Sequence, residues 1–141
     1  MGLAQTKFVP YEMKASMVQI ISYEGKSPKG FLVNPFYEGP RYFENLTQLL
    51  FLIEDMQNAL SYPQKCMESR QFYGEKRTEP LMTEQPEHTE HPEPIATFKI
   101  SVLFRQNASW QGTVVWMDRQ TEAQFRSVLE LIMLMDSVLA E

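Results

Sequence analysis

A gap-free match between the two halves of this 141-residue chain constrains its fold more than any other feature. Residues 14–59 align on residues 96–141 at a shift of 82 positions, and six of the 46 pairs are identical. Apolar positions also coincide, as in the pairs Ile20 and Val102, Leu46 and Val128, and Leu50 and Ile132. Because the match covers strand-like and helix-like stretches alike, it predicts two copies of one supersecondary unit. A chance match between two amphipathic stretches is the alternative.

Each half has the pattern of three strands followed by a helix. In the second half, apolar and polar residues alternate over residues 98–105, which is typical of a half-buried strand. Residues 112–117 and 122–125 predict two further strands after turns. The corresponding strands of the first half are expected over 17–23, 31–37 and 41–43. Pro35 would place the second of these at a sheet edge or a bulge.

The two helices have matching start signals. Asn45 and Gln48 in the first half, and Ser127 and Glu130 in the second, have the spacing of a capping box. The small polar residue accepts from the first free amides, and we expect Gln48 or Glu130 to accept from the amide of the cap residue. The helices are expected to end near residues 60 and 140.

The second helix is apolar around most of its circumference. A helix that packs on a single sheet needs only one apolar stripe, so this helix must be covered on a second side. The sequence therefore predicts an α+β fold of two tandem βββα units. In this fold, antiparallel strands pack on two central apolar helices with pseudo-twofold symmetry. Another subunit could equally cover the helix.

A connector separates the units, which we place at residues 1–62 and 96–141. Residues 79–94 contain five Glu, four Pro and both His, with no Lys or Arg. Such a segment has few apolar groups to offset the entropy of ordering its backbone. We expect residues 63–95 to form a flexible, acidic, proline-rich connector, and the two units to form one compact domain.

Composition excludes several classes of function. The net charge of −5 argues against nucleic acid as a partner, because such proteins need an excess of Lys and Arg. No apolar run reaches the roughly 20 residues that span a membrane, and we find no segment typical of a secretory signal. The single Cys66 excludes a disulfide scaffold and favours a reducing compartment. We therefore expect a cytoplasmic protein.

Catalytic groups are scarce in the two units. His88 and His91 are the only histidines, and both lie in the connector. Their spacing allows metal binding, but a solvated connector is the interpretation we favour, with no metal or cofactor. Glu54 and Asp136 occupy equivalent helix positions and could form a carboxylate pair, or mark solvated helix faces. The sequence predicts a protein that is not an enzyme.

The turn after the first strand of the second half offers a ligand-binding alternative. Asn107, Ser109 and Gly112, close after Arg105, resemble half of the signature of PilZ domains, which are β-barrels that bind cyclic di-GMP. The chain lacks the RxxxR half of that signature. Turn formation explains the same residues. If the turn does bind a small ligand or nucleotide, we expect the contacts from Arg105, Asn107, Ser109 and Trp110.

A second resemblance covers about a third of the chain. RQNASWQG at 105–112 and FRSVLELIMLMDSVL at 125–139 are similar to small uncharacterised proteins of gut Firmicutes, which are domains of unknown function. This resemblance implies a bacterial protein and no activity. The uncovered helix surface instead favours association with another protein or with a second copy as a homodimer. The expected interface residues are Leu129, Met133, Leu103 and Val115.

Overall fold

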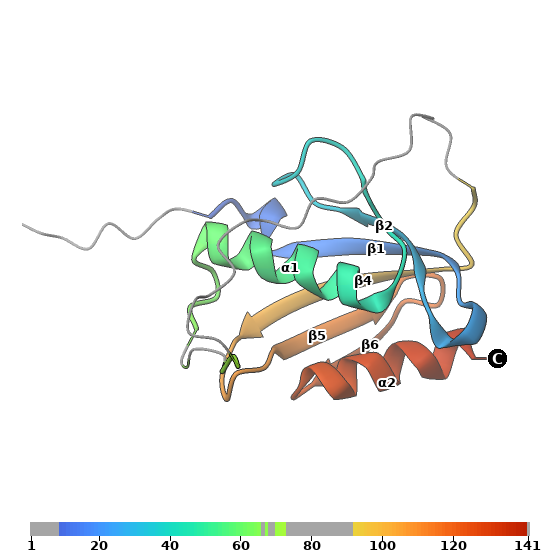
Figure 1. Ribbon diagram of the computed structural model, residues 1–141. Helices are drawn as coiled ribbons and strands as arrows, with labels where there is room; N and C mark the ends of the chain where they lie inside the picture. The colour runs from blue at the N-terminus through green and yellow to red at the C-terminus, as the bar shows by residue number, and fades with distance from the viewer. Residues whose placement is uncertain (1–8, 66, 68–69, 73–91, 141) are drawn as a thin grey trace, which may run out of the picture.

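The strands and helices follow the predicted order. In a computed structural model, residues 9–65, 67, 70–72 and 92–140 are described, and they form one six-stranded antiparallel sheet and two α-helices (Figure 1). This confirms the α+β class. The elements are β1 (Ala15–Ser22), β2 (Lys29–Val33), β3 (Arg41–Phe43), α1 (Leu46–Leu60), β4 (Ala96–Phe104), β5 (Gln111–Trp116), β6 (Thr121–Phe125) and α2 (Val128–Leu139).

The first strands of the two halves meet at the centre of the sheet. The strand order is β3-β2-β1-β4-β5-β6, and all neighbours are antiparallel. Val18 on β1 lies opposite Phe98 on β4, and Ile20 lies opposite Ala96. Each half therefore supplies three adjacent strands, and the central β1–β4 pair joins residues far apart in the sequence.

Both helices cover the same face of this sheet (Figure 1). Alternate strand residues point into the layer between sheet and helices, since the side chains of a strand alternate between faces. The larger of the two buried apolar clusters contains residues from both halves. It includes Val18, Ile20, Leu32, Phe43, Leu49, Phe98, Ile100, Phe125 and Leu131. This shared core positions α1 and α2 relative to each other.

The opposite face of the sheet carries partly exposed apolar side chains. Leu103 on β4 is 45% exposed, and Val115 on β5 is half-buried. Val115 lies opposite Lys99 in the β4–β5 register, so this face mixes apolar and charged side chains. No helix covers this open face among the described residues. Each helix packs on the other face of the sheet with one side, and its outer side points away from the sheet (Figure 1).

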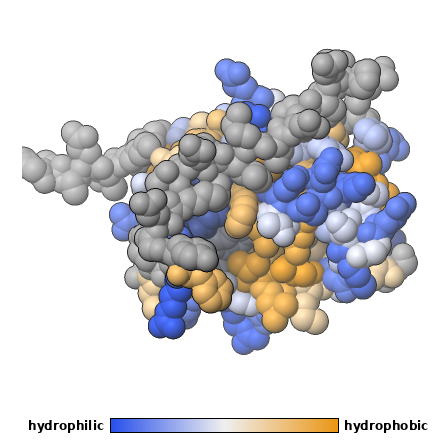
Figure 2. Space-filling model, in the orientation of Figure 1, coloured by the Kyte–Doolittle hydropathy of each residue, from blue (hydrophilic) through white to orange (hydrophobic). Residues whose placement is uncertain are grey.

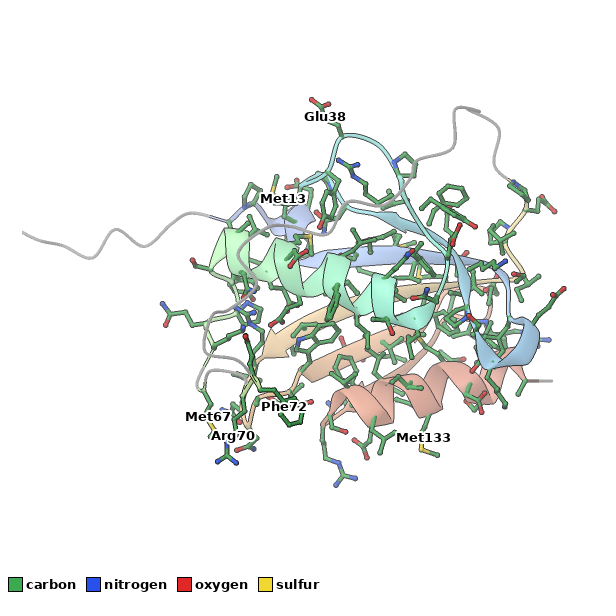
Figure 3. All side chains as sticks on the ribbon, in the orientation of Figure 1. Met13, Glu38, Met67, Arg70, Phe72 and Met133 are labelled. Carbon is green, nitrogen blue, oxygen red and sulfur yellow. The ribbon has the colours of Figure 1, made fainter. Side chains whose placement is uncertain are left out.

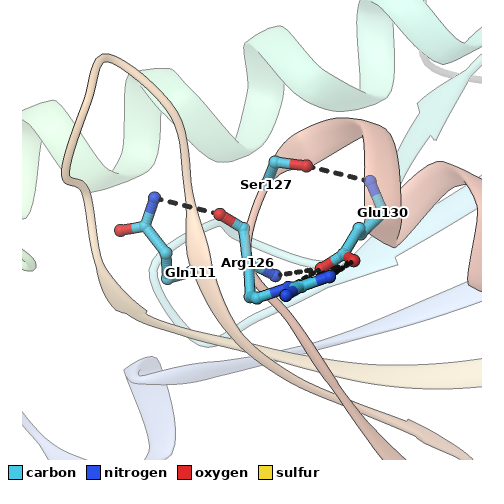
Figure 4. Close-up of polar contacts among 4 residues, drawn as sticks. All are labelled: Gln111, Arg126, Ser127 and Glu130. Atoms are coloured by element: carbon cyan, nitrogen blue, oxygen red, sulfur yellow. Dashed lines mark hydrogen bonds and ion pairs between the residues drawn. The ribbon is translucent and has the colours of Figure 1, made fainter.

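The helix caps form as expected, with one difference. Asn45 Oδ1 accepts from the amide of Gln48 at 2.9 Å, and Ser127 Oγ accepts from the amide of Glu130 at 3.1 Å. The returning side chains, however, bond one residue earlier than predicted. Gln48 Oε1 accepts from the amide of Glu44, the residue before the first cap. Glu130 Oε1 accepts from the amide of Arg126, the residue before the second cap (Figure 4). The extended backbone of each cap residue brings these preceding amides within reach.

The predicted strand over 31–37 is wrong beyond Val33, where β2 ends. Asn34 begins a turn at this point, because its Oδ1 accepts from the Phe36 amide at 2.9 Å. Its Nδ2 donates to the Met13 carbonyl and to Ser16 Oγ, which fixes the turn beside the start of β1. Pro35 therefore follows the strand instead of interrupting it, and it cannot donate to a ladder.

Several sequence predictions lie outside the described residues. Cys66, His88, His91 and most of the 63–95 connector belong to this group. Among the residues described, neither helix combines the length and the apolar character that a membrane crossing requires.

Candidate functional site

A pocket of about 180 Å³ opens beside α1. Three parts of the chain form it: the middle of α1, the segment after α1, and the turn between β4 and β5. The start of α2 closes one side. The lining residues are Leu50, Phe51, Glu54, Lys65, Met67, Arg105, Ala108, Ser109, Trp110 and Val128. Most of its wall is apolar, and three charged side chains lie together in it.

Glu54 is the centre of the polar contacts in this pocket. Its Oε2 accepts from Lys65 Nζ at 2.8 Å. Its Oε1 accepts from Trp110 Nε1 at 3.2 Å and lies 3.3 Å from Arg105 Nη1. Only 23% of the Glu54 side chain is exposed, so it does not mark a solvated helix face. These contacts join α1 to the β4–β5 turn.

The Arg105 side chain is 4% exposed and has hydrogen-bond partners on several sides. Its Nε donates to the Pro63 carbonyl at 2.6 Å, and its Nη1 donates to Asn58 Oδ1 at 2.8 Å. A buried charge needs such partners, because the loss of hydration is otherwise costly. Arg105 therefore ties the end of α1 to β4.

These contacts keep Glu54 ionised. Burial alone would raise the pKa of its carboxyl group. Hydrogen bonds from Lys65 and Trp110, together with the charges of Lys65 and Arg105, outweigh burial, so the pKa of Glu54 lies below its usual value. The pocket thus holds a carboxylate at neutral pH.

The structure brings three of the four predicted ligand contacts into this pocket. Arg105, Ser109 and Trp110 line it, whereas Asn107 does not. Asn107 has a φ of 56° and serves the turn itself. Ser109 Oγ accepts from the Val128 amide at 3.0 Å, so this side chain satisfies a free amide of α2. Trp110 is 5% exposed, and its ring belongs to the core.

The equivalent helix carboxylate, Asp136, has its own contacts. Its Oδ1 accepts from Tyr23 OH at 2.8 Å and from Lys26 Nζ at 2.7 Å. Burial and the hydrogen bond to Asp136 raise the pKa of Tyr23 to about 12. Glu54 and Asp136 thus bind different partners, and the described contacts do not make them the carboxylate pair considered from the sequence.

The four predicted interface residues fall on two surfaces. Leu129 and Met133 lie on the outer side of α2 and are 65% and 63% exposed. Leu103 and Val115 lie on the open face of the sheet, opposite the helix layer. The structure does not bring these two pairs together.

The sequence did not indicate the rest of the pocket. Lys65 was not among the expected site residues, and Leu50 and Val128 were noted only as apolar positions shared by the two halves. Besides the turn residues Arg105, Ser109 and Trp110, the one sequence signal for this site is the match of Glu54 to Asp136. Its partners are 11, 51 and 56 positions away in the sequence, and only the folded sheet brings them together.

The described residues contain no cluster of three or more His, Cys, Asp or Glu that could hold a metal ion. A comparison with known protein families, curated proteins and solved structures found no match to this chain.

Proposed function

We propose that this protein is a non-catalytic association module that forms a homodimer through the outer face of α2. The expectation of a cytoplasmic location remains part of this proposal. The observation that carries it is the exposure of two large apolar side chains one helical turn apart. Leu129 and Met133 are 65% and 63% exposed, and Met133 projects from α2 away from the sheet (Figure 3).

The surface around these two residues is also apolar. Ile132 and Leu134 on the same helix are only partly buried. Figure 2 shows hydrophobic atoms gathered at the centre of the face that carries α1 and α2. Exposed apolar surface of this kind is typical of sites where proteins associate.

Charge favours a second copy of the chain as the partner. The chain carries a net charge of −5, which opposes self-association in general. On α2, however, both carboxylates are paired: Glu130 Oε2 lies 2.6 Å from Arg126 Nη2, and Asp136 Oδ1 lies 2.7 Å from Lys26 Nζ. Two copies of this face can therefore meet without like-charge repulsion, in the twofold arrangement that is commonest among oligomers.

Sedimentation velocity at micromolar concentrations tests the proposal. We expect a concentration-dependent species of twice the 16.5 kDa of the chain. Replacing both Leu129 and Met133 by Lys should weaken the dimer by about 2 kcal/mol or more, or roughly thirtyfold in dissociation constant.

The matched control for the single variant Leu129→Lys is Leu103→Lys, which adds the same charge at an exposed leucine on the open sheet face. We expect it to leave the dimer unchanged. If the unaltered protein remains a monomer, or if Leu103→Lys disrupts the dimer as strongly as Leu129→Lys, the proposed interface is wrong.

We also propose that the fold arose from two copies of a βββα unit. The support is that equivalent positions in the two halves share unusual structural features. The strand ladders shift register between Ile20 and Ser22 and between Val102 and Phe104, which correspond at the 82-residue shift. Gly30 and Gly112, also equivalent, face the partner strand so closely that an added Cβ would lie 1.8 and 1.9 Å from a carbonyl oxygen.

The packing of helices against the sheet supports the same duplication. Phe43 and Phe125, at equivalent positions, are 0% and 2% exposed, and Leu49 and Leu131 are 1% and 2% exposed. In each half, the buried phenylalanine ends the third strand and the leucine begins the buried side of the following helix. Two unrelated halves have no reason to match at this level of detail.

A further inference from the structure

We propose that the pocket beside Glu54 and Lys65 binds a small monocarboxylate that carries one aromatic or branched apolar group. The volume of the pocket limits the size of the ligand. The pocket holds about 180 Å³, whereas sites for drug-sized ligands hold roughly 300–1,000 Å³. A cavity of about 150 Å³ accommodates one benzene molecule. The pocket therefore fits a single ring with a short chain. This inference does not depend on the association proposed above.

The apolar wall of the pocket indicates that it contacts an apolar part of the ligand. Leu50 from α1, Val128 from α2 and Met67 from the segment after α1 surround the pocket, together with the indole of Trp110. Trp110 donates its indole N–H to Glu54, which fixes the ring plane in the wall. Thioether and indole groups pack well on aromatic rings.

The charges of the lining residues indicate which polar group the ligand carries. The lining residues carry two positive charges, on Lys65 and Arg105, and one negative charge, on Glu54. The site thus has an excess of one positive charge, which favours a single anionic group and disfavours a cation. The low dielectric of a partly buried pocket strengthens this preference.

Lys65 is the residue that can meet the anion. Its Nζ makes one described contact, with Glu54 Oε2 at 2.8 Å, and an ammonium group has three donors. Its side chain lines the pocket and is 22% exposed, which leaves donors for a ligand there. Arg105, in contrast, is engaged by Pro63, Asn58 and Glu54. One accessible cation suits a carboxylate better than a phosphate.

Three probes of the same shape test this assignment: phenylpropionate, phenylpropanamide and phenylpropylamine. The readout is the NMR signal of the Trp110 indole N–H, with Trp116 as the internal reference because it does not line the pocket. We expect phenylpropionate to shift the Trp110 signal in a saturable way. The neutral amide and the amine should bind at least about tenfold more weakly, as expected for the loss of a charged hydrogen bond.

Lys65→Met tests the residue directly, since it keeps the aliphatic stem and removes the charge. We expect it to weaken phenylpropionate binding about tenfold and to leave the amide unaffected. Lys29→Met, at an exposed lysine on β2, is the matched control and should change neither. If Lys65→Met does not fold, the comparison of the three probes on the unaltered protein still tests whether the pocket binds a monocarboxylate.

Three results would overturn the proposal. One is the absence of a saturable shift of Trp110 with phenylpropionate. Another is an amide or amine that binds as tightly as the acid. The third is a short peptide with a C-terminal phenylalanine that binds more than tenfold tighter than phenylpropionate, because the pocket would then recognise a chain end and not a small monocarboxylate.

Discussion

Arg105 and Tyr23 stand 82 positions apart, and each bonds the helix carboxylate of the other half. Arg105 Nη1 lies 3.3 Å from Glu54 Oε1, and Tyr23 OH lies 2.8 Å from Asp136 Oδ1. The two contacts differ in burial. Arg105 is 4% exposed, whereas the Asp136 side chain is 35% exposed. The same position in each half therefore connects the sheet to the helix of the other half. The contact of Arg105 is buried, and the contact of Tyr23 is partly exposed.

This difference predicts unequal losses of stability. Arg105→Met removes a buried cation and leaves the Pro63 carbonyl and Asn58 without their donor, so we expect a loss of about 3 kcal/mol in the free energy of unfolding. Tyr23→Phe removes one partly exposed hydrogen bond and should cost about 1 kcal/mol. Urea unfolding of both variants measures the two values. Equal losses would contradict the assigned roles.

Acid should remove the contribution of Glu54. Its pKa is lower in the folded chain than the ordinary value of 4.5, so its stabilising effect is complete above that value. The effect declines as the pH falls through the folded pKa. We therefore expect the stability difference between the unaltered protein and Glu54→Gln to shrink below pH 4.5. A difference that grows as the pH falls would show that the pKa is raised instead.

Glycine substitution tests the close approach of β2 to β1 and of β5 to β4. A Cβ at Gly112 would lie 1.9 Å from the Ser101 carbonyl oxygen, and one at Gly30 would lie 1.8 Å from that of Gln19. Neither backbone can move away cheaply, so we expect alanine at either position to cost more than about 3 kcal/mol.

Gly25→Ala is the control for these two variants. Its Cβ would meet nothing within 4 Å, and only its φ of +62° is unfavourable. We expect a loss of about 1–2 kcal/mol from that conformation. Thermal unfolding compares the three variants. A milder effect at Gly112 than at Gly25 would mean that the β4–β5 spacing is wrong.

The alternation of apolar residues was enough to predict the strands and the shared core. Val18, Ile20, Phe98 and Ile100 each point to the buried face, as period-two patterning requires. The helix starts were also predictable, because Asn45 and Ser127 act within their own helical turn. Such features depend on residues near in sequence, which pattern analysis can compare directly.

The candidate site could not be predicted in the same way. Glu54, Lys65 and Trp110 meet only after β4 and β5 are added beside β1, and the pattern of either half alone does not place them together. The end of β2 was missed for a related reason. Asn34 leaves the strand because it bonds Met13 and Ser16, which lie 21 and 18 positions earlier in the chain.

Cutting the connector tests whether the two halves form one folding unit. β1 and β4 are paired at the centre of the sheet, and one core contains residues from both halves. We expect a protease site placed within residues 73–91 to yield two fragments that still elute together in gel filtration. Fragments that separate without denaturant would show that the halves are stable apart and that the shared core contributes little.

Spin labels at residue 137 test the proposed dimer face most directly, because Ser137 is exposed on α2 one turn beyond Met133 and both proposed interface residues stay intact. We would replace Cys66 by Ser and Ser137 by Cys, attach a nitroxide, and measure the dipolar interaction between labels on two chains. We expect a strong interaction at residue 137 and a much weaker one for a label at residue 99, on the open face of the sheet. A dimer whose labels interact no more strongly at residue 137 than at residue 99, or no interaction between chains at all, would contradict the association face on α2.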